Sequence, residues 1–540
     1  MTHQNSNQNG YRASGRHHWP QALVLALALG GALALPRGAQ ALNFDIGDLT
    51  VNLDTTLSYG AQMRVAERDP DLIGKAHFDP LISTRSNAEQ RAAKGRFSNN
   101  SDDGNLKYDQ GDLTSNAVRI TSEMDIQYNN NFGAFVRANW FYDFENEDRD
   151  DISEIAKRFV GEDFTLLDAY IYGDFELPNG FMSIRVGRQV VSWGENTFIQ
   201  NGINVINPVD VARLRQAGSQ LKEAFLPINM IWTSVPITQN LSLEGVLMTE
   251  FEQIDPDPAG TYFSTNDFAT PGGEFAMLGF GLLPDDRKPD GSFPDGALPR
   301  ARTRFPDDDP DQFGFALRYF APDLGFTEFG LYYLHYHSRL PLISGTTVTT
   351  QDTSSGNFFV SFPEDIDLVG LSFNTTLGGT WSLAGEVSHK FDAPYQIDDV
   401  EVLFAGLSPL NALIPQPVNR FNSQLGQFGP DEEIRGFERF DTTQVQATLT
   451  NIFPPSQTFG WDQLTGLLEV GATQVWDLPP ESVLRFNGPG TDTGGGPDFL
   501  TGAFRNPITQ EDGFATEFSA GYRLLLRASY ENAIGSVSLE

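Results

Sequence analysis

Apolar and polar side chains alternate along residues 116–144, in two limbs that are separated by the asparagines at 129–131. Val118, Ile120 and Ile126 share one phase of the first limb, and charged residues occupy the other phase. Because successive side chains of a strand point to opposite faces, each limb has an apolar and a polar face. The pattern predicts an antiparallel hairpin, which fits either a soluble sandwich or a membrane barrel.

The length and the recurrence of such strands favour the barrel. The first strand, predicted over 49–65, exceeds the roughly five or six residues of a soluble strand and reaches the roughly nine to eleven of a tilted membrane strand. The alternation recurs in strands that we predict near 167–175, 182–186, 224–235, 241–251, 313–320, 326–338, 366–376, 381–390, 443–453, 466–476 and 521–530.

The connections between these strands alternate between short and long. The long ones lie at 66–115, 145–165, 191–223, 252–311, 339–365, 391–442 and 477–519. A sandwich has no reason to place every long connection at one end, whereas outer-membrane barrels do so. The sequence therefore predicts an all-β fold: a transmembrane antiparallel up-and-down β-barrel with short periplasmic turns and long extracellular loops.

At the end of the sequence, Gly535, Val537 and Leu539 begin a fifteenth strand that stops in mid-pattern. Bacterial barrels have an even number of strands and close their edges, and a terminal Phe or Trp is missing here. We therefore expect the chain to lack its C-terminal strands, and a complete barrel to have about 16 to 18 strands.

Composition agrees with a membrane barrel and excludes some function classes. The 42 Phe, 15 Tyr and 7 Trp, many at strand ends, are typical of interfacial girdles. A net charge of −35, from 71 acidic and 36 basic residues, argues against nucleic acid as a partner. Without cysteine there is neither a disulfide nor a thiolate metal site.

The N-terminus predicts the compartment. Arg12 and Arg16 precede the apolar run 22–35, and Ala39-Gln40-Ala41 matches a small-residue cleavage site. This arrangement predicts a secretory signal peptide over 1–41, cleavage after Ala41 and export through the periplasm to the bacterial outer membrane. Residues 42–540 would then form the barrel.

Charged residues in the polar phase are candidates for lining the interior. They include both acidic and basic side chains, so their charge does not identify a substrate. Glu123 is expected opposite Arg137 as a cross-strand ion pair. The alternative interpretation is a set of charges that fills a wide interior without selecting solutes. The candidates are Arg119, Glu123, Asp125, Arg137, Asp168, Asp174, Arg185, Arg318, Glu328 and Glu386, together with Glu244 and Lys390.

The third long connection, Val191 to Glu223, has apolar residues that suggest a short amphipathic helix, namely Val209, Val211, Leu214, Leu221, Ala224 and Phe225. By analogy with general porins, this loop would fold inward, and Arg213, Arg215 and Lys222 would line a constriction. Alternatively, the loop packs outward on the rim of the barrel.

Two further groups of residues contain side chains that could carry chemistry. Ser338 with His335, His337 and His389 would suit a lipid-cleaving barrel enzyme, but the flanking residues lack an orienting Asn or Asp and an oxyanion site, so no catalytic residue is predicted. The acidic runs at 255–258, 285–286 and 307–311 offer carboxylates for Ca²⁺ but lack the spacing of a calcium loop. We therefore predict neither a metal site nor a cofactor.

Several segments resemble one family of large Gram-negative outer-membrane proteins, catalogued as a domain of unknown function, number thirteen-oh-two. They are LSYGAQ at 57–62, DDGNLKYDQGDLTSN at 102–116, SIRVGRQVVSWGE at 183–195, NGINVINPVDV at 201–211 and GTYFSTNDF at 260–268. The resemblance implies further strands with a terminal Phe, an RND-type exporter as a partner and traffic of hydrophobic compounds. It implies no catalytic residues.

The sequence thus favours an outer-membrane channel or export component for hydrophobic or amphipathic small molecules, which would pass through a loop-gated interior without chemical change. The membrane lipid and lipopolysaccharide would be its surroundings, and divalent cations would bridge the acidic loops to the lipopolysaccharide. An alternative is a surface binding or adhesion protein that uses its acidic loops. A barrel lipid hydrolase is the third.

Overall fold

The computed structural model describes residues 42–129, 131–307, 311–413, 421–456, 458, 460–487, 513–534 and 537–539. The predicted signal peptide, residues 308–310 of one acidic run and Gly535 lie outside these ranges. Over the described residues, one sheet of 16 strands follows the order of the chain, and every neighbouring pair is antiparallel. This is the wall of a transmembrane up-and-down β-barrel, as predicted.

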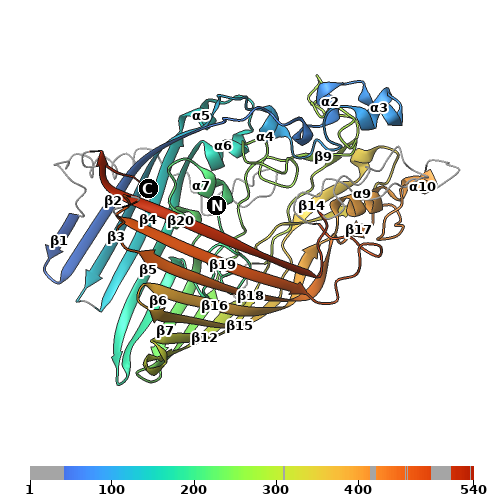
Figure 1. Cartoon of the computed structure of the whole chain (residues 1–540). Coiled ribbons are helices and arrows are strands. Elements are labelled where there is room, and N and C mark those ends of the chain that lie inside the picture. Colours follow the sequence, from blue (N-terminus) through green and yellow to red (C-terminus); the bar gives the residue numbers. More distant parts are fainter. Residues whose placement is uncertain are drawn as a thin grey trace.

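The strands of the wall are β1 (Leu42–Ile46), β2 (Leu49–Met63), β3 (Leu113–Tyr128), β4 (Phe132–Asp143), β5 (Glu162–Leu177), β6 (Gly180–Gln189), β7 (Ile228–Pro236), β8 (Leu241–Met248), β11 (Gln312–Ala321), β12 (Thr327–Tyr336), β15 (Ile366–Gly378), β16 (Trp381–Gln396), β18 (Phe437–Phe453), β19 (Gln463–Val475), β20 (Phe518–Ile534) and β21 (Val537–Leu539). In Figure 1 this sheet curves around the segment that carries helix α7 (Val211–Arg215). Among the described residues the edge strands β1 and β21 are not paired with each other, so the sheet is not closed.

The sequence pattern missed β1 and shortened several other strands. β1 pairs with β2 across a tight turn at Gly47, whose φ of +64° suits glycine, and its five residues were too few to show a period. β16 continues to Gln396 and β18 begins at Phe437, both beyond the ends that the sequence predicted. A register shift between Lys390 and Ala393 interrupts the alternation there, so the pattern did not show these extensions.

A bulge in β5 changes which residues face the interior. Leu167 and Asp168 both lie opposite Arg137 of β4, since Val136 pairs with Ala169 and Ala138 pairs with Leu166. A bulge of this kind places two residues against one and re-aims a side chain. Leu167, expected on the outer face, is therefore buried, and Asp168 reaches Arg137 at 2.9 Å.

The outer face of the wall is apolar. Exposed apolar side chains recur at every second position of the strands, as at Phe329 and Leu331 of β12 and at Val369 and Leu371 of β15. Aromatic side chains gather next to the short turns, where they are exposed at Phe132, Phe175, Phe181, Phe320, Phe326 and Trp381. An apolar band bordered by aromatic residues is the surface that a membrane barrel presents to lipid.

The long connections, expected as loops, fold into a cap. It contains helices α2 (Lys75–Phe78), α3 (Asn87–Ala92), α4 (Asp103–Leu106), α5 (Phe144–Asp148), α6 (Glu154–Val160), α9 (Asp399–Leu407) and α10 (Leu410–Leu413), with strands β9 (Phe275–Met277), β10 (Ala297–Pro299), β13 (Leu342–Thr346), β14 (Asn357–Ser361) and β17 (Glu433–Ile434). Short 3-10 turns occur at Pro70–Leu72, Ile82–Thr84 and Thr353–Ser355 in these connections, and at Pro322–Leu324 between β11 and β12. The cap has its own apolar core, in which Phe268 packs on Phe358 and Phe362 packs on Phe251.

No helix in the described part of the chain is long and apolar enough to cross a membrane.

Candidate channel interior and its inner loop

The connection between β6 and β7, residues 190–227, runs along the inner face of the wall and is called the inner loop below. It is attached at one place to β2–β5 and at another to β16–β19. Of the two arrangements left open by the sequence, the structure has the inward one.

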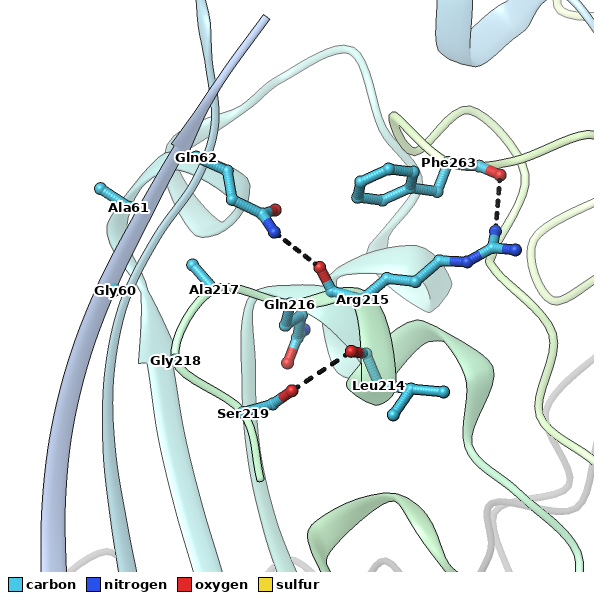
Figure 2. Close-up of a pocket in the computed structure, with 10 residues that line it drawn as sticks. All are labelled: Gly60, Ala61, Gln62, Leu214, Arg215, Gln216, Ala217, Gly218, Ser219 and Phe263. Carbon is cyan, nitrogen blue, oxygen red and sulfur yellow. Dashed lines mark hydrogen bonds between the residues drawn. The ribbon is translucent and has the colours of Figure 1, made fainter. Parts of the chain in front are cut away.

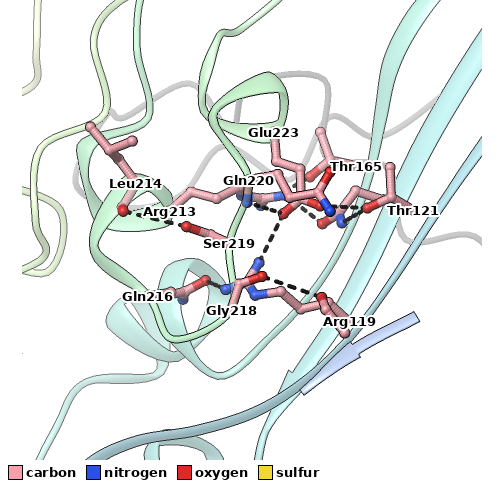
Figure 3. A network of polar contacts seen from close by, with 12 residues as sticks. Arg119, Thr121, Thr165, Arg213, Leu214, Gln216, Gly218, Ser219, Gln220 and Glu223 are labelled. Atoms are coloured by element: carbon pink, nitrogen blue, oxygen red, sulfur yellow. Dashed lines mark hydrogen bonds and ion pairs between the residues drawn. The ribbon is translucent and has the colours of Figure 1, made fainter. Parts of the chain in front are cut away.

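Arg119 of β3 anchors the second half of the inner loop to the wall (Figure 3). Its buried guanidinium donates to the backbone oxygen of Ala217 at 3.2 Å and to the side-chain oxygen of Gln216, and it lies 3.6 Å from the Glu223 carboxylate. Thr121, the next inward residue of β3, donates to the same carboxylate. Arg119 therefore holds the loop in place and is not exposed to a passage.

Arg213 of α7 is also buried, against β4 and β5. Its guanidinium donates to Asp163 at 2.8 Å and to Asn139 at 2.9 Å, and it lies 3.5 Å from Asp210. The sequence suggested Arg213 as a constriction residue. The structure instead uses it as an anchor, because the polar side of α7 faces the polar inner wall.

The single amphipathic helix expected here is two short ones. Helix α7 ends at Arg215, because the backbone of Gln216 is extended (ψ of 147°), and α8 (Leu221–Ala224) follows. Leu214 and Leu221, two of the apolar residues that suggested the helix, are 45% and 64% exposed. The apolar residues of this part of the loop are therefore divided between an exposed side and a buried side, which includes Ala212 and Ala224.

Two carboxylates on the opposite wall hold the first half of the inner loop. Glu469 of β19 accepts hydrogen bonds from the backbone N–H groups of Thr197, Phe198 and Ile199 at 2.7–2.8 Å. Glu386 of β16 accepts from the N–H groups of Glu195 and Ile203 and from the amide of Gln446. Backbone N–H groups away from bulk water need such acceptors, so these carboxylates fix the loop's path.

Lys390 and Gln444 fasten the same part of the loop. The Lys390 ammonium donates to the backbone and side-chain oxygens of Asn201 at 2.8 and 2.5 Å, and the Gln444 amide donates to the Gln200 oxygen at 3.0 Å. The inner loop is therefore bound to both walls and crosses the interior between them.

The remaining candidates form ion pairs and ring contacts on the inner wall. Arg137 pairs with Glu123 at 2.6 Å, as expected across the hairpin, and Lys222 of the inner loop pairs with the other Glu123 oxygen at 2.9 Å. Arg318 pairs with Glu244 at 2.7 Å and Glu328 at 2.8 Å. The other contacts are Arg185 with the rings of Tyr170 and Trp232, Asp125 with the Tyr172 hydroxyl, and Asp174 with the Ser183 hydroxyl.

A cavity of about 530 Å³ opens between β2 and the inner loop (Figure 2). Its edge is the close contact of Gly60 with Gly218, where a Cβ on Gly60 would lie 2.5 Å from the Gly218 nitrogen. Arg215, 44% exposed, reaches from this cavity to Asp257 and to the backbone oxygen of Phe263. Among the three constriction candidates, Arg215 is thus exposed, Lys222 is partly exposed at 31%, and Arg213 is buried.

A second cavity, of about 230 Å³, lies within the cap. Met277, Phe280, Leu298, Phe358 and Leu403 give it an apolar lining, and Asn100 and Asp399 add polar groups at its wall. Such a mixture suits an amphipathic small molecule.

The residues suggested for lipid hydrolysis are not arranged as a catalytic pair. In the described structure the Ser338 hydroxyl donates to the Leu340 backbone oxygen at 3.3 Å. His337 accepts from the Asp365 N–H through Nδ1 and lies 3.2 Å from Asp311 through Nε2. His335 contacts Asp367 at 2.9 Å, so these histidines bind cap and wall carboxylates.

Sequence reasoning missed Glu469, Trp193 and Gly60. Glu469 stands between Leu468 and Val470 in the inward phase, a signal that the pattern did contain. Trp193 is buried on β8, β11 and β12 and donates to Glu244 at 2.8 Å. Gly60 gives no signal in the sequence, because its role is a close approach to the inner loop.

A search of curated proteins finds no match. Among solved structures, the chain is similar to the outer-membrane channel DcaP of Acinetobacter baumannii (8% identity, 79% of this chain and 80% of that chain covered, TM-score 0.30). It is also similar to the anion-selective porin from Comamonas acidovorans (9%, 80% and 81%, 0.30) and to OccD3 (OpdP) of Pseudomonas aeruginosa (12%, 93% and 86%, 0.27).

The family model described as "Protein of unknown function (DUF1302)" matches residues 22–540, which confirms the resemblance seen in the sequence. The chain therefore belongs to the DUF1302 family.

Proposed function

We propose that the protein is a channel of the bacterial outer membrane through which hydrophobic or amphipathic small molecules pass without chemical change. The observation that carries this proposal is the inner loop, which is bound to both walls and narrows the interior. A loop fixed in this way defines a constriction, as a passive channel needs for selectivity.

The side chains of the inner loop favour a solute with apolar parts. Leu214 and Leu221 of the loop are exposed, and Phe263, which is also exposed, lines the cavity next to β2 together with Leu214. The cavity of the cap, with its apolar and polar lining residues, would offer such a solute a first binding place outside the constriction. The ion pairs of the inner wall would bind the polar part of the same molecule.

The proposal also covers the lipids that would surround the protein and one partner protein. The apolar outer band would contact membrane lipid, with lipopolysaccharide around the cap. An RND-type exporter, which the family resemblance implies, would supply solutes from the periplasmic side. In this arrangement the inner loop would act as the gate.

Replacing residues 195–223 by a short Gly-Ser linker is expected to raise the single-channel conductance at least about twofold, because the linker removes the obstruction from the interior. The measurement is conductance in planar bilayers, compared with the full-length protein. A matched control shortens the cap at 286–296, away from the inner loop.

Steady conductance of the unmodified protein, increased by the loop replacement and not by the control, would support the channel. A bilayer that stays closed for both proteins at every voltage would refute passive passage. Binding of amphipathic solutes to a closed protein would then favour the surface-binding alternative.

Lowering the pH from 8 to 5 is expected to shift the ion preference of the channel toward anions. Burial raises the pKa of Asp257 to about 6, against the opposing effect of Arg215. Above that pH the carboxylate is charged and compensates Arg215. Below it the carboxyl is neutral, so the exposed Arg215 adds a positive charge to the passage.

The reversal potential in a salt gradient measures this preference, with an expected midpoint near pH 6. Asp257→Asn should remove the shift and hold the channel at its low-pH preference, whereas the exposed Asp295→Asn should leave the shift unchanged. A pH shift of unaltered size in Asp257→Asn would contradict this assignment.

A further inference from the structure

Two connections of the cap, between β2 and β3 and between β8 and β11, are docked on each other. Asn99 donates to the Leu283 oxygen at 3.0 Å, and Asn100 accepts from the Met277 N–H at 2.6 Å. The Ala76 N–H donates to the Gly281 oxygen at 2.8 Å. This docking brings acidic residues together that are far apart in the sequence.

Three carboxylates converge at this junction. Asp102, Asp103 and Asp267 each present an oxygen within 4.8 Å of the other two. Asp102 and Asp103 begin the DDGN segment and Asp267 lies in the GTYFSTNDF segment, two of those that carry the family resemblance. His77, Asp102 and Asp285 form an adjoining group with the same spacing.

Asp102 is the buried centre of both groups. Its side chain is 0% exposed, and one oxygen accepts from the Gly74 N–H at 2.7 Å. The other oxygen is buried and has no hydrogen-bond donor in the described structure. The same holds for one oxygen of Asp267, whose second oxygen accepts from the Asp103 N–H. Buried carboxylate oxygens are normally bound by a donor or a cation.

The protein's own cations compensate this charge in part. Lys107 pairs with Asp103 at 2.9 Å, and the positive charge of Arg96 interacts electrostatically with the carboxylates of Asp102 and Asp267. Asp285 adds a further carboxylate at 3.4 Å from His77. The carboxylates outnumber the permanent cations, so the junction carries excess negative charge.

We propose that Asp102, Asp103 and Asp267 bind a calcium ion that ties these two connections of the cap together. Calcium is a hard cation that takes carboxylate and water oxygens, which this group and the adjoining solvent supply. The proposal is independent of what the channel carries. It assigns to the cap a structural ion that the sequence, which lacks a calcium-loop pattern, did not predict.

The test uses the full-length protein in detergent, freed of divalent ions with a chelator and titrated with CaCl₂. Calorimetry should give a dissociation constant of roughly 0.1–1 mM, the range of extracellular calcium modules. Calcium should also slow proteolysis of the cap. Asp102→Asn and Asp267→Asn should each weaken binding by at least about tenfold. Asp295→Asn, an exposed carboxylate of the same connection, is the matched control.

A second measurement separates ion binding from folding. In chelator, Asp102→Asn should resist proteolysis as well as the unaltered protein or better, because it relieves carboxylate repulsion and keeps an acceptor for Gly74. If Asp102→Asn lost its resistance to proteolysis both with and without calcium, the proposal would be overturned. Absence of binding at about 10 mM Ca²⁺, well above the expected range, would also overturn it, as would binding of Zn²⁺ with no response to Ca²⁺.

Discussion

Glu386→Gln combined with Glu469→Gln is expected to raise the single-channel conductance at least about twofold and to make it fluctuate. Both carboxylates accept hydrogen bonds from backbone N–H groups of residues 195–203. A glutamine turns one acceptor oxygen into an NH₂ donor that faces those N–H groups. Each hydrogen bond to a charged group contributes about 1.5–3 kcal/mol, so losing several of them should release this part of the loop.

The measurement is conductance and current noise in planar bilayers, with protease sensitivity of the inner loop as an independent readout. Glu328→Gln is the matched control, because it changes a wall carboxylate that pairs with Arg318 of the neighbouring strand. Unchanged conductance together with an inner loop that remains resistant to protease would show that these carboxylates do not hold it.

The wall was predictable because a membrane strand repeats every two residues. Lipid on one side and a polar interior on the other impose that period over about nine or more residues, which is longer than chance patterns last. The same phase placed Glu123 opposite Arg137, and the two side chains do pair at 2.6 Å. Errors occurred where the period is interrupted, as at the bulge of Leu167 and in the short strand β1.

The path of the inner loop was not predictable from the pattern. The Ile199 N–H and its acceptor Glu469 are 270 residues apart, and a backbone donor leaves no trace in the amino-acid sequence. The phase of a strand shows that Glu469 faces inward but not what it binds. Likewise, the sequence shows Arg213 only as one of several cationic residues in a loop. Its burial depends on contacts with Asn139 and Asp163, which belong to two separate strands.

The cap was missed for a related reason. Its strands are two to five residues long and its helices mostly four to nine, too short for a period to emerge. Its core instead depends on contacts between distant aromatic residues, such as Phe268 with Phe358. The calcium junction shares this origin, since Asp103 and Asp267 come from different connections.

Arg213→Met is expected to destabilise the folded barrel by about 3–5 kcal/mol, the usual effect of removing one partner from a buried ion pair. The methionine retains an apolar stem but takes the positive charge away from Asp163 and Asp210, both of them buried. The Asn139 side-chain oxygen would also lose its guanidinium donor. The measurement is the temperature at which the barrel unfolds in detergent, followed by circular dichroism and gel mobility.

Arg304→Met gives the matched comparison, because Arg304 pairs with Glu433 at the same 2.8 Å but both side chains are more than half exposed. Exposed ion pairs contribute about 0–1 kcal/mol, so this variant should unfold close to the unaltered protein. Adding Asp163→Asn to Arg213→Met should recover part of the loss, since it removes the uncompensated carboxylate. If Arg213→Met were no more destabilising than Arg304→Met, the buried cluster would not be what holds the inner loop to β4 and β5, and the loop would depend on the contacts of Glu386 and Glu469 at the other wall.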